Sequence, residues 1–319
     1  MKPNRTYTLN ERAYTAIHPL TEELSFDSDQ PFVFDLAYLS ALEIMGDNAL
    51  SFLQGQISSD LNDVTANQMR PGAICNLQGR LMALLDVIQW QGVHLILPQD
   101  LLELTASALS KAALFSRVTL KPNPSFSFLG YYTPSAKHVD IKVPTAAWES
   151  QQTEDSYCYA ISDKLFIIML DTTHKDALLA QFPPTQHRGS LAWHYLELQQ
   201  PRFSLYPNTR GLFLPHRLGL QDTPYLSFNK GCYKGQEVIA RMHYRAKLKH
   251  EVKSYYIETA APIFSGQKMY AKPQASEIGE VIDYCPVAAE TYLILSSVLL
   301  ERPSSVYFDQ HQDAISLGD

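Results

Sequence analysis

One cysteine of this chain lies in a segment whose neighbours would change its chemistry. The run from Lys230 to Glu237 reads KGCYKGQE and leads into residues whose apolar positions fit one face of a short helix. Cys232 would then stand just before a helix N-terminus, where partial positive charge favours the thiolate, the form that attacks carbon or sulfur. On residue types alone, a surface turn whose cysteine merely fills a crevice is an equal alternative.

The residues around Cys232 support the first interpretation in distinct ways. Gly231 and Gly235 permit a sharp bend and the close approach of a ligand or partner. Glu237, in the expected first turn, complements the helix dipole and can bond back to a free backbone N–H. Nearby positive charge comes from Lys230, Lys234 and Arg241. We assign the chemistry to Cys232 and Lys230, and the supporting motif to Gly231, Tyr233, Gly235, Gln236, Glu237 and Arg241.

The elements that must position this motif can be read from hydrophobic patterning. A strand–turn–strand–helix pattern at 90–102 recurs at 160–179, where Asp171 is the expected helix cap; duplication and chance remain equally open. The pattern indicates α+β layering rather than strict β-α-β alternation. A further helix at about 49–54 is expected to follow a Gly46–Asp47 cap and to end at Gly55. The other expected elements are strands at 31–35, 40–45, 73–77, 81–90 and 93–97 and a helix at 99–114.

The pattern changes after Arg245. Short strand-like runs separated by turn signals follow, without a long helix, and they predict a small β-barrel or sandwich. We therefore divide the chain into a first region of residues 1–245, composed of α+β subdomains, and a C-terminal region of residues 246–319.

Composition limits the class of protein. The 319 residues carry a net charge of −7, with 45% hydrophobic and 18% charged residues. These values exclude a disordered chain and argue against a dedicated DNA- or RNA-coating protein, although a local basic patch stays possible. The first 20 residues lack the apolar core of a secretory signal, and no stretch approaches the ~18 apolar residues of a membrane span, so a cytoplasmic protein is expected.

The cysteines argue against a disulfide framework or a metal site. The four cysteines lie far apart, without a C-x-x-C pair, so no metal ligation is expected. Three of them, Cys75, Cys158 and Cys285, are interpreted as ordinary core thiols.

The cysteine motif resembles the signature of the YgfZ-type folate-binding proteins, relatives of the glycine-cleavage T-protein, an aminomethyltransferase. Weaker blocks extend the likeness over most of the chain: FLQGQISSD at 52–60, FSRV at 115–118, FLP at 213–215, LSF at 226–228 and GEV at 279–281. The resemblance implies an α+β fold with ββα-type subdomains around a central opening that accepts a reduced folate, followed by a small C-terminal β-barrel. It also implies tetrahydrofolate or a derivative as cofactor, and a role in making or maintaining iron–sulfur enzymes, including those that modify tRNA.

The resemblance to the T-protein is incomplete at its catalytic acid. Where that enzyme has two aspartates after a strand turn, this chain has Ala83 and Leu84, which cannot exchange a proton. Asp86 lies two or three residues further on, a displacement that changes its depth and, if three residues, the face of the strand as well. Whether the chain is an enzyme at all stays open.

Two further residues are assigned to the cofactor, Glu197 and Arg245. Glu197 resembles the T-protein glutamate that bonds the pterin ring, and a carboxylate can accept two parallel N–H bonds from a 2-amino-4-oxo pyrimidine edge. A solvated helix glutamate is the alternative. Arg241 and Arg245 share one helix face, and they belong to a basic run that can be a solvated face, a site for a folate glutamyl tail, or a contact for RNA phosphates. That run is completed by Lys247, Lys249 and Lys253.

Three functions follow for testing. The first is a folate-dependent accessory factor for iron–sulfur enzymes or their assembly factors, with Cys232 as the essential group. The second is a folate-dependent aminomethyltransferase or methyltransferase, and the third a non-catalytic module that binds tRNA or protein. We expect reduced folate and iron–sulfur proteins as partners, a possible tRNA contact, and neither DNA nor a membrane. A thiol hydrolase using His216, His243 or His250 is disfavoured, because no third orienting residue or oxyanion loop is recognisable.

Overall fold

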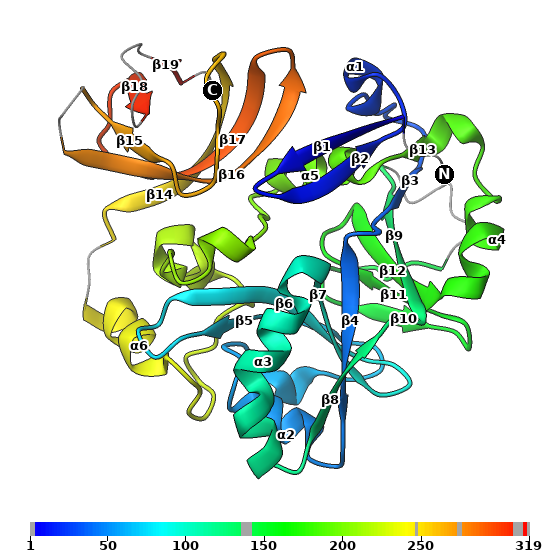
Figure 1. Ribbon diagram of the computed structural model, residues 1–319. Coiled ribbons are helices and arrows are strands. Elements are labelled where there is room, and N and C mark those ends of the chain that lie inside the picture. Colours follow the sequence, from blue (N-terminus) through cyan, green and yellow to red (C-terminus); the bar gives the residue numbers. More distant parts are fainter. Residues whose placement is uncertain (1–3, 135–141, 246–247, 273–275, 309–314, 318–319) are drawn as a thin grey trace.

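The computed structural model describes residues 4–134, 142–245, 248–272, 276–308 and 315–317. Within these ranges the strands form four sheets, and short helices pack on them (Figure 1). The predicted α+β class is confirmed, because consecutive strands pair mainly antiparallel and the helices follow them as coverings.

The strands predicted at 40–45, 73–77, 81–90 and 93–97 belong to a five-stranded antiparallel sheet. Its order is β5-β6-β7-β4-β8. Helix α3 (Gln99–Phe115), predicted at 99–114, packs on this sheet. Helix α2 (Ala49–Gln54) ends at Gly55 as predicted, but the predicted Gly46–Asp47 cap is wrong: Asn48 occupies the cap position and its side chain makes no capping bond. The strands are β4 (Leu39–Met45), β5 (Arg70–Cys75), β6 (Leu81–Gln89), β7 (Val93–Pro98) and β8 (Thr119–Asn123).

A second, six-stranded sheet has the order β10-β11-β12-β9-β3-β13, with β13 and β3 parallel. The Asp171 side chain accepts from the Thr173 N–H as the predicted cap, although it opens a 3₁₀ turn that leads into α4 (Lys175–Leu179). The two similar segments at 90–102 and 160–179 therefore lie on different sheets. The strands are β3 (Phe32–Asp35), β9 (Phe126–Tyr132), β10 (Ser150–Gln152), β11 (Ser156–Ala160), β12 (Leu165–Asp171) and β13 (His187–Arg188).

Helix α5 (Ser190–Gln199), which carries Glu197, is held tightly against this second sheet and a neighbouring hairpin. A Cβ at Gly130 of β9 would lie 2.4 Å from the Trp193 ring, so only glycine allows the helix to come this close. The helix start is tied to the hairpin by the Thr15 N–H, which donates to Ser190 Oγ over 2.9 Å. The hairpin consists of β1 (Arg5–Leu9) and β2 (Arg12–Ala16), and α1 (Leu20–Glu23) follows it.

The C-terminal strands form a curled six-stranded sheet of order β14-β17-β16-β15-β18-β19 (Figure 1). The predicted barrel is thus a curled half-barrel, whose first strand begins at His250 rather than near 247. Residues 246–247 lie outside the described residues. Lys247 is one of them, and the proposed boundary falls directly before them, so the two-region division stays a prediction. The strands are β14 (His250–Glu258), β15 (Lys268–Tyr270), β16 (Glu277–Ala288), β17 (Thr291–Leu299), β18 (Ser305–Phe308) and β19 (Ile315–Ser316).

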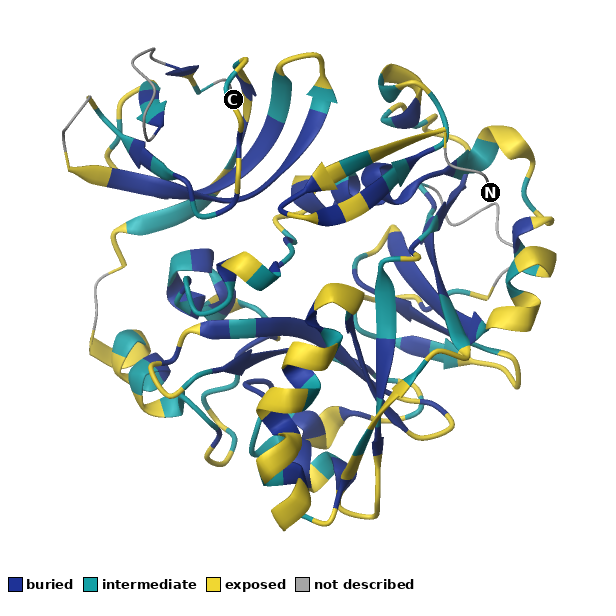
Figure 2. Ribbon diagram, in the orientation of Figure 1, coloured by how far each residue is buried: buried dark blue, intermediate teal, exposed yellow. Residues whose placement is uncertain are grey.

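Buried residues concentrate on the inner faces of the sheets, whereas α3 and α4 show exposed outer faces (Figure 2). As predicted, Cys75, Cys158 and Cys285 are buried, and Cys232 is exposed. In the part of the chain that the structure describes, no helix combines the length and apolar character needed to cross a lipid bilayer.

Candidate functional site

The cysteine loop is anchored on the segment that follows α2. The Lys230 ammonium donates to the carbonyl oxygens of Ile57 (2.7 Å) and Ser59 (2.6 Å). Backbone bonds add to this anchor, because Ser227 N–H donates to the Ser58 carbonyl over 2.9 Å and Lys234 N–H donates to the Gly55 carbonyl over 3.2 Å. Residues 55–59 and 227–234, which belong to the two most family-like blocks of the sequence, are therefore one structural unit.

The fixed position of Lys230 changes its acidity. Burial lowers the pKa of its ammonium to about 8, and the nearby Asp60 carboxylate opposes part of this shift. The ammonium also lies 5.3 Å from the centre of the Tyr233 ring, which is buried. Lys230 thus holds the loop through two carbonyls, which is a structural contribution that the sequence did not reveal.

Helix α6 (Gln236–Arg245) begins four positions after Cys232, as predicted. The side chain that bonds back at its start is Gln236, whose Oε1 accepts from the Tyr233 N–H over 3.1 Å. The bond to a free backbone N–H was predicted for Glu237, but Glu237 is an exposed acid in the first turn of the helix. Cys232 is exposed, and it therefore stands accessible beside a helix start.

Gly235 fixes the helix against the turn that joins β5 and β6. Its φ is +85°, and a Cβ there would lie 2.4 Å from the Asn76 carbonyl oxygen and 3.1 Å from Cys75 Cβ. Across the same contact, Gly79 has a φ of +71° and faces Val238. Gly231, by contrast, has no atom within 4 Å of a Cβ placed on it. Of the two motif glycines, only Gly235 is required by packing.

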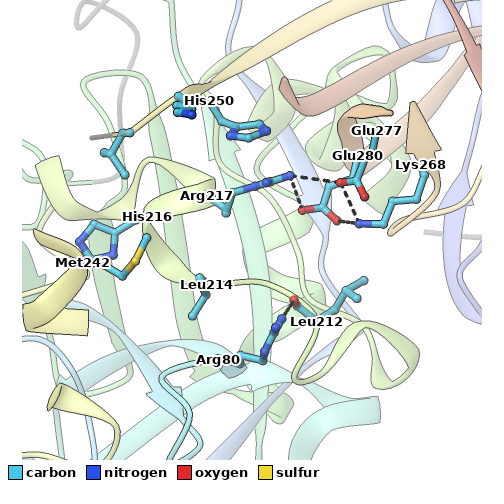
Figure 3. A pocket seen from close by; sticks show the side chains of 12 residues that line it. Arg80, Leu212, Leu214, His216, Arg217, Met242, His250, Lys268, Glu277 and Glu280 are labelled. Atoms are coloured by element: carbon cyan, nitrogen blue, oxygen red, sulfur yellow. Dashed lines mark hydrogen bonds and ion pairs between the residues drawn. The ribbon is translucent and has the colours of Figure 1, made fainter. Parts of the chain in front are cut away.

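A cavity of about 560 Å³ lies next to this unit, between α6 and the C-terminal sheet (Figure 3). Arg217 donates to Glu280 over 3.1 Å, and Lys268 bonds both Glu280 and Glu277, so these four charges balance one another. The ring of His216 is buried in the wall, and among the described residues neither ring nitrogen has a hydrogen-bond partner. Burial and the neighbouring His243 lower the pKa of His216.

Arg241 and Arg245 lie exposed on α6, beside the exposed Tyr244. The ring of His243 from the same helix stacks on Phe228, with centroids 3.7 Å apart. The outer face of α6 therefore combines exposed guanidinium groups with aromatic side chains.

Glu197 lies elsewhere, in a buried cluster of opposite charges. Arg202 Nε donates to Glu197 Oε1 over 3.0 Å, and Arg202 Nη2 donates to Asp86 Oδ2 over 3.0 Å and Oδ1 over 3.3 Å. The Tyr159 hydroxyl donates to Asp86 Oδ2 over 3.1 Å. Burial raises the pKa of Glu197, and Arg202 and His194 oppose that rise. The pKa of Arg202 is held well above its usual value by the two carboxylates, against its own desolvation.

This cluster separates a small cavity from a larger one. The small cavity, about 50 Å³, is lined by Glu197, Asp86, Leu84 and Arg202. The larger, about 320 Å³, shares Leu84, Arg202, Phe203 and Tyr225 with it, whereas Glu197 and Asp86 line the small cavity alone. The regular register of β6 places Asp86 on the same face as Leu84 and on the opposite face from Ala83. The larger cavity is further lined by Trp148 and Leu218.

Trp148 contributes to the larger cavity in an unusual backbone conformation. Its φ is +71°, a left-handed conformation that is costly for an aromatic residue. Its carbonyl accepts from the Met69 N–H over 3.0 Å and from the Gln68 side-chain amide over 3.2 Å, so surrounding bonds hold the strain in place.

The structure therefore separates two groups that sequence reasoning had joined. Cys232 is exposed as predicted, but neither the small cavity at Glu197 nor the larger one beyond Arg202 has Cys232 in its wall, and Lys230 and its neighbours tie the cysteine loop to segment 55–59. Arg202 was missed altogether. Its signal was an arginine directly after Pro201 and before Phe203, a few residues beyond Glu197.

The fold defines the class of the protein. A crystal structure of glycine cleavage system aminomethyltransferase T from Bartonella henselae matches 99% of this chain and 93% of its own length, with a TM-score of 0.71 and 13% identity. At that identity the match establishes a shared fold. The chain accordingly has the T-protein fold.

Sequence comparison defines its relatives more narrowly. Proteins named tRNA-modifying protein YgfZ match from Colwellia psychrerythraea, 28% identical over 69% of this chain and 70% of the relative, and from Vibrio atlanticus, 25% identical over 67% and 66%. A Yersinia pestis protein of the same name is 27% identical over 63% of this chain and 64% of its own length. No protein-family profile matches the chain. The chain is a homologue of the YgfZ proteins, as its cysteine motif predicts.

Proposed function

We propose that the chain is a folate-binding protein of the YgfZ type that supports the assembly or maintenance of iron–sulfur enzymes, among them enzymes that modify tRNA. The observation that carries the proposal is the buried Glu197 carboxylate, which is bonded to Arg202, a residue in the wall of a cavity of about 320 Å³ with aromatic sides, within a T-protein fold. The name of the relatives supports the link to tRNA modification. The expected site of action is the cytoplasm.

The residues present fit a reduced folate chemically. A carboxylate accepts the two parallel N–H donors of a 2-amino-4-oxo pyrimidine edge, and the rings of Trp148, Phe203 and Tyr225 offer faces for a pterin. The volume lies within the range of small-molecule sites. When bound, a reduced folate supplies a carrier for a one-carbon unit. Glu197 would orient the ring, and the aromatic wall would exclude water from it.

An aminomethyltransferase activity is less well supported. The residue of β6 that faces the cavity is Leu84, which has no proton to exchange. Asp86, one step further along the same face, already accepts bonds from Arg202 and from the Tyr159 hydroxyl. An acid engaged in this way is not free to act on a substrate amine.

We assign the essential chemistry to Cys232. Its side chain is exposed, so replacing it should leave packing intact. In a strain that lacks the endogenous homologue, Cys232→Ser should fail to restore the activity of iron–sulfur enzymes, while its thermal midpoint stays at the wild-type value. Full complementation by Cys232→Ser would reject the assignment.

A contact with tRNA is a narrower part of the proposal, and the exposed face of α6 supports it. Arg241 and Arg245 are solvent-accessible beside Tyr244, a combination suited to phosphates and unstacked bases. Salt-sensitive tRNA binding that is lost in Arg241→Ala/Arg245→Ala would support this contact. Binding that is unchanged in this variant would exclude the face.

A further inference from the structure

We propose that Arg202 is a built-in competitor of the folate ring: its guanidinium occupies the pairing position on Glu197, and it must move away before a pterin can bind there. This inference rests on the proposed folate site and adds its regulation. It makes Arg202 the residue that sets the affinity of the site.

The competition follows from the chemistry of the two groups. The edge of a 2-amino-4-oxo pyrimidine presents an N–C–N fork of N–H donors, and a guanidinium presents the same fork. Arg202 divides this fork between two carboxylates: Nε donates to Glu197 Oε1 over 3.0 Å, and Nη2 donates to Asp86 over 3.0 and 3.3 Å. Because the fork of a pterin needs both oxygens of Glu197, the Nε bond to Oε1 must break before the ring can pair there.

The cavities show where the ring would meet this obstacle. The space enclosed between Glu197 and Arg202 is about 50 Å³, enough for a water molecule but not for a bicyclic ring. The space of about 320 Å³ on the other side has room for a ring, and Arg202 lines both cavities. A ring that enters the larger cavity therefore reaches Arg202 before it reaches Glu197.

Two features allow Arg202 to leave Glu197. Its Nη1 is buried without a hydrogen bond of good geometry among the described residues, and the side chain of Tyr225 is its further polar neighbour, so Nη1 is held less firmly than Nε and Nη2. Asp86 offers a second carboxylate, itself fixed by the Tyr159 hydroxyl, on which Arg202 can remain paired. The exchange then replaces the single Nε donor on Glu197 by the donor pair of the ring, so the carboxylate is hydrogen-bonded before and after it.

The test is calorimetric titration of 5-formyltetrahydrofolate into the full-length wild type, Arg202→Ala and the control Arg70→Ala, whose arginine makes a surface ion pair with Asp63. Arg202→Ala should bind at least 10-fold more tightly than the wild type, and Arg70→Ala should bind like it. Arg202→Lys, which keeps the charge but loses the fork, should also bind more tightly, and it serves if the alanine variant does not fold.

Two further readouts separate competition from a structural effect. Guanidinium ion at low millimolar, non-denaturing concentration should weaken folate binding to Arg202→Ala competitively and leave the wild type unaffected. Adding Glu197→Gln to Arg202→Ala should abolish the gain in affinity.

The outcomes distinguish the inference from the function on which it rests. Equal or weaker binding by both Arg202 variants, with measurable binding by the wild type, would overturn the competitor role and leave the folate site standing. If neither the wild type nor any of the variants binds the folate, the proposed folate function itself is refuted. Binding by the Arg202 variants alone would be the strongest support.

Discussion

Gly235 offers the sharpest test of how the cysteine motif is built. Its φ of +85° lies in the left-handed region, and a Cβ would stand 2.4 Å from the Asn76 carbonyl oxygen, a backbone atom that cannot rotate away. Gly231, four positions earlier in the same motif, has open space around its Cα and no such φ. The pair Gly235→Ala and Gly231→Ala therefore separates packing from mere membership in the motif.

The expected cost follows from two contributions. A non-glycine residue in the left-handed region costs about 1–2 kcal/mol. Forcing an extra methyl into a packed contact costs about 1–3 kcal/mol, because the turn that contains Asn76 must shift. The reduced freedom of the unfolded chain returns about 0.4–1 kcal/mol. Gly235→Ala should thus lose about 1–4.6 kcal/mol of unfolding free energy, whereas Gly231→Ala should change it by no more than about 0.5 kcal/mol.

Urea unfolding measures the two free energies, and the thiol reagent DTNB measures the state of the loop. In the native wild type one thiol, that of Cys232, should react quickly, because the other three cysteines are buried. Gly231→Ala should keep that rate, and Gly235→Ala should change it because α6 no longer seats on the β5–β6 turn. Equal stabilities for the two variants would refute the packing argument.

Two other predictions concern charges near the same unit. Glu280→Ala leaves Arg217 and Lys268 without their most buried partner and should lower the unfolding free energy by about 1–3 kcal/mol. Glu277→Ala removes the more exposed carboxylate and should lower it by no more than about 1 kcal/mol. Urea unfolding of the two variants measures both values. The pKa of Lys230 is about 8 in the folded chain and near its ordinary 10.5 when unfolded, so the unfolded state binds more protons between these values. The unfolding free energy should therefore rise more with pH from 8 to 10 in the wild type than in Lys230→Met, and parallel curves would contradict the burial of that amine.

Local sequence patterns were enough to predict several helices and strands of the fold. The residues of α3 and of β6 and β7 were predictable to within one or two positions, because apolar spacing and turn residues act within a few neighbours. The exposure of Cys232 was predictable for a similar reason, since glycines and lysines flank it, whereas Cys75 and Cys158 lie among apolar strand residues.

Long-range pairing was beyond such patterns. Arg202 and Asp86 are 116 positions apart, and nothing local in either segment announces that they share an ion pair. The same holds for Lys230, whose acceptors are carbonyl groups more than 170 positions away and therefore leave no trace in residue type. The comparison of motifs places Asp86 two or three positions after the expected aspartates, and the register of β6 shows that it shares a face with Leu84 and not with Ala83.

The cavity beside Arg202 and the loop that carries Cys232 share no lining residue, but the chain segments that form them are neighbours in sequence. Tyr225 lines the larger cavity beside Arg202, and its carbonyl accepts from the buried Ser58 hydroxyl over 2.6 Å. Lys230 is bonded to the residues on either side of Ser58, so one anchored segment carries both the cavity wall and the exposed sulfur of Cys232. The blocks at 52–60 and 226–237 are thus bonded to each other through Lys230 and through the backbone of Ser227 and Lys234, so a change in either is expected to reach both the cavity wall and the cysteine loop.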